Sequence, residues 1–286
     1  MNILSRLKGY FLLGKPRISS LLIFSGVATY VYASDKIYLQ NFILFTVLGT
    51  MMVFAANTFN SYLDIESDRL MYRTKYRPLP SGMVSKPEAL SYGFILISIS
   101  SLGLMYVFGV EAMAAALFGA LYYIFIYTLL LKNRTIYNTV VGGVAGFMPT
   151  ITGWLAAGNP INITVILISL LVFFWSPAHF WSLAYAIKDE YKASRFLMLP
   201  AVKPEDVIKK HIIGFNIVTE AIYIILLLIL DGLVVKIGIV IGLLLIAKSI
   251  NLIYMRLDRG NAWRSFKLST TSLFIFYIAL FIDGIL

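Results

Sequence analysis

Residues 41–61 read NFILFTVLGTMMVFAANTFNS, a run that contains no Asp, Glu, Lys or Arg. A helix of about 20 apolar residues crosses the roughly 30 Å hydrocarbon core of a bilayer. The whole chain has this character, since 59% of its 286 residues are apolar and only 13% are charged. A soluble domain has about 25% charged residues, and a chain of this length cannot hide so much apolar surface in a water-soluble fold. We therefore expect an integral membrane protein.

Eight more apolar runs are long enough to span a bilayer, which makes nine in all. The expected spans are 18–34, 41–61, 89–109, 112–131, 137–157, 162–186, 211–230, 233–255 and 267–285. Gly142, Gly143, Gly146 and Pro149 in the fifth span predict close helix packing or a kink there. The expected fold is all-α and polytopic, with nine transmembrane helices around a central cavity in one membrane-embedded domain, residues 1–286.

The distribution of positive charge predicts the orientation. The chain has 24 Lys and Arg against 14 Asp and Glu, a net charge of +10. With nine spans and a cytoplasmic N-terminus, only Lys36 and Lys236 fall in outer loops, and the other 22 lie in cytoplasmic segments. Positive residues stay on the cytoplasmic side, so we expect a multi-pass plasma-membrane protein with its C-terminus outside and no nucleic-acid partner. The absence of cysteine excludes thiolate metal sites and cysteine nucleophiles.

The segment after the second span carries a set of oxygen ligands. Asn60, Asp64 and Asp68 fall at i, i+4 and i+8, so on a helix they would share one face. Two carboxylates and an amide oxygen suit Mg²⁺, which usually keeps several waters and is completed by substrate phosphates. The alternative to a metal site is that these polar residues only form the solvated end of a membrane helix.

Three cations follow these carboxylates within a short reach, at Arg73, Lys75 and Arg77. Arginine and lysine can hold the non-bridging oxygens of a diphosphate. Alternatively, they only mark the cytoplasmic side of the membrane.

These residues resemble a known family. The pattern N-x-x-x-D-x-x-x-D followed by R-T-x-x-R-P-L-P-S-G resembles the first aspartate-rich motif of the UbiA superfamily of intramembrane prenyltransferases. Three further stretches resemble its protoheme IX farnesyltransferase (heme O synthase) branch: Lys15-Pro16-Arg17, Trp175–Trp181 and Tyr191–Pro200. The resemblance covers nearly the whole chain.

The resemblance implies a reaction and its participants. Mg²⁺ held by Asp64 and Asp68, with Asn60 and a further amide at Asn57 assisting, would help the diphosphate of farnesyl diphosphate to leave. A heme b vinyl group would attack the allylic carbon, and water would complete a hydroxyethylfarnesyl side chain. Besides membrane lipid, the implied protein partner is a downstream heme-modifying enzyme or terminal oxidase. The residues implied to contact the substrates are Lys15, Arg17, Arg73, Lys75, Arg77, His179, Lys188 and Tyr191.

The loop after the sixth span departs from the family pattern. Glu190 stands where the branch usually has Asp, and Ser194, Arg195 and Leu197 replace its usual small residues and proline. We expect Asp189 or Glu190 to supply one carboxylate ligand to the metal. Whether one or two Mg²⁺ ions bind is left open by this pattern. An ordinary juxtamembrane charge cluster is the alternative.

His179 is the ionisable residue that would select heme as the acceptor of the prenyl group. A single His in an apolar helix is more often a hydrogen-bonded structural residue, but intramembrane ionisable groups are costly and usually functional. The resemblance implies contact with heme, as axial ligand or as donor to a propionate. Two alternative functions remain: prenylation of a quinone precursor or lipid, and a cation-coupled transporter whose Asp64 and Asp68 line a water path.

Overall fold

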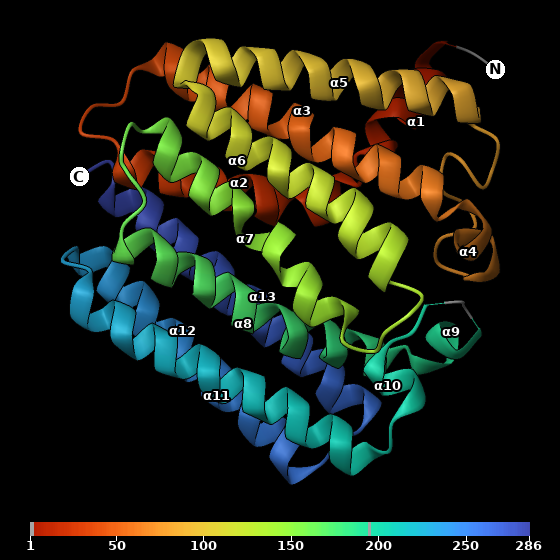
Figure 1. Cartoon of the computed structure of the whole chain (residues 1–286). Coiled ribbons are helices and arrows are strands. Elements are labelled where there is room, and N and C mark those ends of the chain that lie inside the picture. Colours follow the sequence, from red (N-terminus) through yellow and green to blue (C-terminus); the bar gives the residue numbers. More distant parts are fainter. Residues whose placement is uncertain (1–2, 194–195) are drawn as a thin grey trace.

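The computed structural model describes residues 3–193 and 196–286, and the part of the chain that it describes is built from helices and connecting turns (Figure 1). Ser194 and Arg195, singled out above, lie outside the described residues. The helices are α1 (Ile3–Leu13), α2 (Pro16–Ala33), α3 (Leu39–Leu63), α4 (Ile65–Leu70), α5 (Lys86–Phe108), α6 (Val110–Leu121), the π-helix η1 (Tyr122–Leu131), α7 (Asn138–Ala156), α8 (Ile163–Ala186), α9 (Lys188–Ala193), α10 (Leu199–Val202), α11 (Glu205–Ile229), α12 (Leu233–Met255) and α13 (Arg259–Asp283).

The predicted set of membrane spans is confirmed. Within the described residues, eight helices are long and apolar enough to cross a membrane, with α6 and η1 counted as one. The ninth candidate span is the pair formed by α1 and α2, which are bent by 56° and are long and apolar enough when counted as one span. The chain is a multi-pass membrane protein.

Two of the spans begin at least six residues earlier than predicted. Helix α11 starts at Glu205 rather than at 211, and α13 starts at Arg259 rather than at 267. Their first turns are polar, so hydropathy does not reveal them, although the backbone is already helical. The side chain of Asp258 caps α13 by accepting a hydrogen bond from the Asn261 N–H at 2.8 Å, which satisfies one of the free donors at a helix start.

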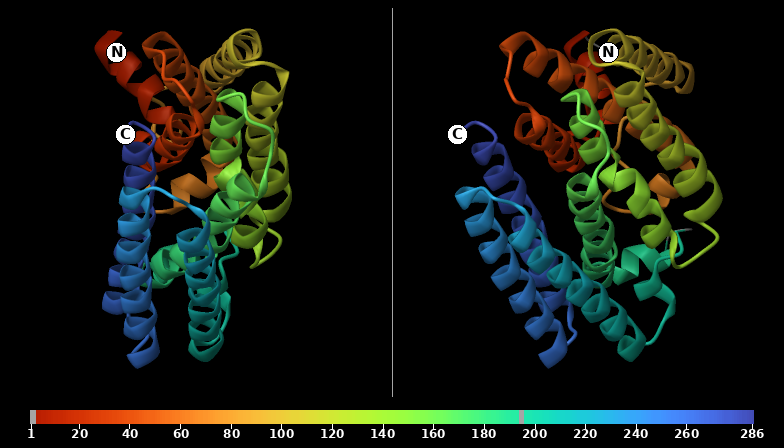
Figure 2. Two further views of the ribbon diagram at one scale, coloured as in Figure 1. Left: turned by 90° about the vertical axis from the view of Figure 1, so that its left-hand side faces the viewer. Right: turned by 60° about the vertical axis from the view of Figure 1, so that its left-hand side comes forward.

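The helices form a bundle whose two ends differ. Figures 1 and 2 show α3, α5 and α6 on one side, α11, α12 and α13 on the other, and α2, α7 and α8 between them. The short helices α4, α9 and α10 gather at one end of the bundle, and the C-terminus lies at the other end (Figure 1). The cytoplasmic placement of the first of these ends stays a prediction.

Close packing was predicted for the glycine-rich span, and α7 shows it. A Cβ atom added at Gly153 would lie 2.2 Å from the carbonyl oxygen of Gly26 in α2. Small residues let membrane helices approach this closely. At Gly142 an added Cβ would lie 2.4 Å from the ring of Tyr127. Glycines of α7 thus bring both α2 and η1 close to the centre of the bundle.

The contact between Gly153 and Gly26 leads to a stability prediction. Gly153→Ala places a methyl group against backbone that cannot move aside, so the variant should lose about 1–3 kcal/mol, the usual cost of overpacking. The matched control is Gly214→Ala in α11, where an added Cβ meets no atom within 4 Å. Thermal unfolding in detergent should show a lowered midpoint for Gly153→Ala alone. Equal midpoints for the two variants would contradict this account of the α2–α7 contact.

Candidate active site

A cavity of about 540 Å³ lies at the centre of the bundle, and every candidate site residue can be placed relative to it. Its lining residues come from α2, α3, α4, α6, η1, α7, α8, α9 and α13 and from the connections next to them, whereas none of the described residues of α5, α11 or α12 lines it. Along α3 the lining runs from Asn60 to Phe45, which is about 22 Å at a rise of 1.5 Å per residue. The cavity is therefore deep, with charged groups near the α4 end.

Asp64 and Asp68 lie at the junction of α3 and α4, and the helix there is not continuous as the spacing predicted. Helix α3 ends at Leu63, and α4 begins at Ile65. Helical hydrogen bonding nevertheless crosses the junction, since the Asp64 N–H donates to Asn60 O at 3.0 Å and the Asp68 N–H donates to Asp64 O at 2.8 Å. All three side chains consequently line the same cavity.

Each carboxylate is buried and paired with a cation. Asp64 accepts from Lys132 Nζ at 2.5 Å, and both oxygens of Asp68 accept from Arg77 Nη1, at 2.9 and 2.8 Å. The two acidic side chains are only 5% and 2% exposed. Buried charges need such partners, because an unpaired one costs several kcal/mol.

The charged end of the cavity carries more positive than negative charge. Five basic side chains line it against the two carboxylates: Lys15, Arg17, Arg73, Arg77 and Lys132. Burial and the nearby Arg77 guanidinium lower the pKa of Lys15 to about 7, so this amine is only partly charged at neutral pH. A cleft lined by one sign of charge attracts ligands of the opposite sign. This end of the cavity is suited to a multiply charged anion.

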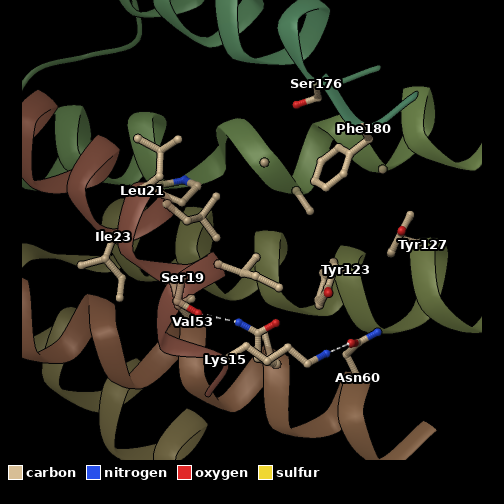
Figure 3. A pocket seen from close by; sticks show the side chains of 18 of the residues that line it. Lys15, Ser19, Leu21, Ile23, Val53, Asn60, Tyr123, Tyr127, Ser176 and Phe180 are labelled. Atoms are coloured by element: carbon tan, nitrogen blue, oxygen red, sulfur yellow. Dashed lines mark hydrogen bonds between the residues drawn. The ribbon is translucent and has the colours of Figure 1, made fainter. Parts of the chain in front are cut away.

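Lys15 enters the cavity from a strained turn between α1 and α2. It is the one non-glycine residue with a positive φ in the described parts of the chain, at φ 52° and ψ 57°. Strained backbone of this kind tends to occur where a side chain must be aimed. The Lys15 ammonium contacts the side-chain oxygen of Asn60, as Figure 3 shows.

His179 lies in the wall of the same cavity, on α8. Its ring stacks on Trp175 with centroids 4.1 Å apart and lies 4.5 Å from Phe266 of α13. Its Nδ1 atom is 2.9 Å from Ser269 Oγ. Trp181, two residues after His179, packs against Phe215 of α11, with centroids 5.4 Å apart.

Aromatic rings form part of the cavity lining. Tyr123 and Tyr127 of η1 stack with centroids 5.4 Å apart and planes at 10°. Trp263 and Phe266 of α13 stack at 5.3 Å, and Phe180 also faces the cavity (Figure 3). Aromatic faces attract cations through their quadrupole, so these walls can stabilise a positively charged apolar species.

Four of the predicted site residues are not among those that line the cavity. Lys75 lies over the rings of Tyr72 and Tyr76, at 4.7 and 5.0 Å. The other three follow α8. Lys188 pairs with Glu205 at 3.5 Å, Asp189 pairs with Arg259, and Glu190 has a buried carboxylate oxygen without a hydrogen bond from the described residues.

Tyr191 is the predicted site residue of the second loop that does line the cavity, together with Phe196 and Met198 of the same loop. Burial raises the pKa of its phenol, and the nearby Arg73 guanidinium opposes that rise. The hydroxyl therefore stays protonated at neutral pH. It brings a neutral polar group rather than a charge to the cavity wall.

Several lining residues were missed by sequence reasoning. Lys132 was counted only as an orientation signal, although its place directly after an apolar span is a weak indication of a role. Tyr123 and Tyr127 of η1 had no motif, and Phe266 lies 87 positions after His179, so no local spacing could connect them.

The ligand chemistry of the charged end fits Mg²⁺. Asp64 and Asp68 offer carboxylate oxygens, and Asn57 and Asn60 add amide groups on the same cavity wall. The described residues contain no group of three or more His, Cys, Asp or Glu that could enclose a metal alone. Magnesium commonly uses one or two carboxylates and completes its shell with waters and substrate phosphates.

A membrane bundle with this cavity has the architecture of an intramembrane prenyltransferase. The model of the UbiA prenyltransferase family matches residues 21–278, and the chain belongs to this family. The transporter alternative is thereby set aside.

Curated relatives agree over nearly the whole length. The chain is 34% identical to the protoheme IX farnesyltransferase of Microcystis aeruginosa, over 99% of this chain and 91% of the relative. It is also 34% identical to the protoheme IX farnesyltransferase of Mycobacterium leprae, over 99% of this chain and 92% of the relative.

Solved structures show the same fold. One, described as digeranylgeranylglyceryl phosphate synthase, aligns with a TM-score of 0.79 at 18% identity, over 98% of this chain and 99% of that one. A UbiA homologue from Archaeoglobus fulgidus bound to DMAPP and Mg²⁺ aligns with a TM-score of 0.72 at 15% identity, over 93% of this chain and 98% of that one.

The buried carboxylates lead to a prediction about prenyl transfer. Asp64→Asn or Asp68→Asn should lower the turnover rate on the order of 10²-fold or more, as loss of a principal charge stabiliser does. Glu66→Gln is the control, because Glu66 is exposed on the same short helix and pairs only with Arg69. Turnover assays of detergent-purified variants would check this, and near-normal rates in both aspartate variants would refute it.

The positions of the three loop cations divide them into two groups. Arg73→Ala and Arg77→Ala should each weaken farnesyl diphosphate binding about tenfold, because both guanidinium groups line the cavity. Lys75→Ala should change it little, since Lys75 lies over tyrosine rings instead. Calorimetric titration with a non-reactive farnesyl diphosphate analogue measures the difference. Equal losses for all three would show that position at the cavity does not matter.

Proposed function

We propose that this UbiA-family prenyltransferase transfers the farnesyl group of farnesyl diphosphate to a vinyl group of heme b, with addition of water, to give heme O. One structural observation carries the proposal: the charged end and His179 belong to one continuous cavity with aromatic walls. The names of the full-length relatives support the same acceptor.

Asn57, Asn60, Asp64 and Asp68 would hold Mg²⁺ at the charged end. When bound, the ion supplies Lewis-acid stabilisation of the charge that develops on the departing diphosphate. The residues themselves do the rest of the binding. Arg73 and Arg77 would bind the non-bridging oxygens, while Lys15 and Lys132, which also line the cavity, would add positive charge.

The proposed reaction balances in three steps. The allylic C–O bond breaks, and its electron pair leaves with the diphosphate. The π electrons of the vinyl group then form the new C–C bond, which leaves a cation on the carbon beside the porphyrin ring. Water adds to that carbon and loses a proton, so heme b, farnesyl diphosphate and water give heme O, diphosphate and a proton.

The aromatic walls and the depth of the cavity serve this chemistry. Tyr123, Phe180 and Phe266 present rings to the space in which the allylic cation forms, and such faces stabilise positive charge. A cavity enclosed by apolar helices limits early capture of that cation by water. The same apolar lining accommodates the prenyl chain and the porphyrin ring.

His179 is assigned to heme contact. Trp175 and Phe266 lie close to its ring, which restricts access to it. Its imidazole would bind the heme iron or a propionate, and this contact would hold the vinyl group towards the allylic carbon. Reacting atoms need to approach within about 3.5 Å.

Incubation of the purified protein with heme b, farnesyl diphosphate and Mg²⁺ tests the proposed reaction. Mass spectrometry should detect heme with an added hydroxyfarnesyl group. Parallel reactions with a quinone precursor and with a glycerol-phosphate lipid test the other acceptors. Prenylation of one of these, with heme unchanged, would replace the heme assignment while keeping the enzyme class.

The role of His179 gives a spectroscopic prediction. His179→Ala should lose heme binding or shift the Soret absorption of the complex, while farnesyl diphosphate binding is retained. His211→Ala is the control, since His211 lies on α11 against Trp181 and does not line the cavity. An unchanged heme spectrum and affinity in His179→Ala would refute the contact.

The remaining assignments are part of the same proposal. Residues 1–286 form one domain in the plasma membrane, with the charged end of the cavity at the cytoplasmic side, as the distribution of Lys and Arg predicts. A heme-modifying enzyme or terminal oxidase would then receive the product.

A further inference from the structure

Two hydroxyl groups lie directly behind the asparagines of the proposed magnesium site. Thr128 of η1 contacts Asn60, and Ser19 of α2 contacts Asn57. We propose that Thr128 and Ser19 are positioning residues that fix the orientation of these two amides, so that each presents its oxygen and not its NH₂ group to the bound cation. The inference rests on the magnesium site proposed above.

The hydrogen bonds around Asn60 permit one amide orientation. Thr128 Oγ1 donates its single hydrogen to the carbonyl of Tyr123 at 2.8 Å, so it can only accept the bond from Asn60 Nδ2 at 3.0 Å. On the other side of Asn60, Lys15 Nζ donates a hydrogen bond to the amide oxygen. A flipped amide would place NH₂ against this donor and an oxygen against a hydroxyl whose hydrogen is already donated to Tyr123 O.

The π-helical backbone of η1 explains why the Thr128 hydroxyl donates its hydrogen to the carbonyl of Tyr123. In an α-helix a threonine hydroxyl bonds to the carbonyl three or four residues earlier, but here it reaches Tyr123, five residues earlier. The Lys132 N–H makes the same step to Tyr127 O at 2.9 Å. Because π-helical turns are rare and frequently occur at functional sites, this wide turn fits a role in placing Thr128.

Asn57, three residues earlier on α3, is oriented in the same way by Gly14 and by Ser19 of α2. Its Nδ2 donates to Gly14 O at 3.2 Å and to Ser19 Oγ at 2.9 Å. Ser19 Oγ donates its own hydrogen to Gly14 O at 2.5 Å, so it too can only accept from the amide. The oxygen of Asn57 is therefore on the side away from these partners.

Fixed amide oxygens matter because a divalent cation binds oxygen and is repelled by an NH₂ group. An asparagine that can flip presents an oxygen only part of the time. Loss of such outer partners typically lowers metal affinity 10- to 100-fold. The expected loss for Thr128 is at the lower end, since two aspartates remain.

The test measures Mn²⁺ binding by electron paramagnetic resonance. It uses the full-length protein in detergent with a non-reactive farnesyl diphosphate analogue, so no turnover is involved. Thr128→Val should raise the Mn²⁺ dissociation constant about tenfold, and Thr128→Ser should keep it within about twofold. Thr58→Val is the matched control, because Thr58 is buried on α3 and donates only to Phe54 O at 2.8 Å. Thr128→Ala is to be measured as well, since it remains informative if valine disturbs packing.

A second variant separates orientation from general damage. Asn60→Asp offers an oxygen in either orientation, so adding Thr128→Val to it should cause no further loss of Mn²⁺ affinity. An equal loss in both backgrounds would overturn the positioning role, as would wild-type affinity in Thr128→Val and Thr128→Ala. Asp64→Asn serves to distinguish the two proposals, because undiminished Mn²⁺ binding in that variant would overturn the magnesium site itself.

Discussion

Burying Asp64 and Asp68 at the end of a membrane bundle requires opposite charge in direct contact, because an ionised carboxylate removed from water costs several kcal/mol. The partners come from different segments. Lys132 follows η1, and Arg77 lies in the connection between α4 and α5. Lys15, at the start of α2, contacts Asn60 beside them. Charge neutralisation thus ties α2, α3 and η1 together where the cavity is polar.

The excess of cations at this end has a consequence for substrate binding. A diphosphate that enters meets more positive charge than the two carboxylates balance, so it can replace the carboxylates as partner of Lys132 or Arg77 without leaving either cation unpaired. Under the proposed function, the apolar remainder of the cavity would take the hydrocarbon part of the same molecule. One cavity with two contrasting ends would then orient an amphipathic substrate before any chemistry occurs.

The sequence was most informative where structure depends on local periodicity. Nine spans follow from the lengths of apolar runs, and Asn60, Asp64 and Asp68 were placed together by their four-residue spacing. Contacts between distant segments were not predictable in this way, such as that of Lys132 with Asp64, which are 68 positions apart. The π-helical form of η1 was also hidden, because its residues are uniformly apolar and give no period of their own.

The polar loops after the second and sixth predicted spans also show that local spacing does not predict contacts between distant segments. They differ in the residues that they bring to the cavity. Both have paired acidic residues near a span end, and sequence alone suggested that both supply carboxylates. The structure brings Asp64 and Asp68 into the cavity but pairs Asp189 with Arg259 outside it. On the cavity wall the second loop places Phe196, Met198 and Tyr191, whose buried phenol remains neutral. With one carboxylate pair instead of two, the charged end keeps its net positive charge, and that charge is what a diphosphate leaving group requires.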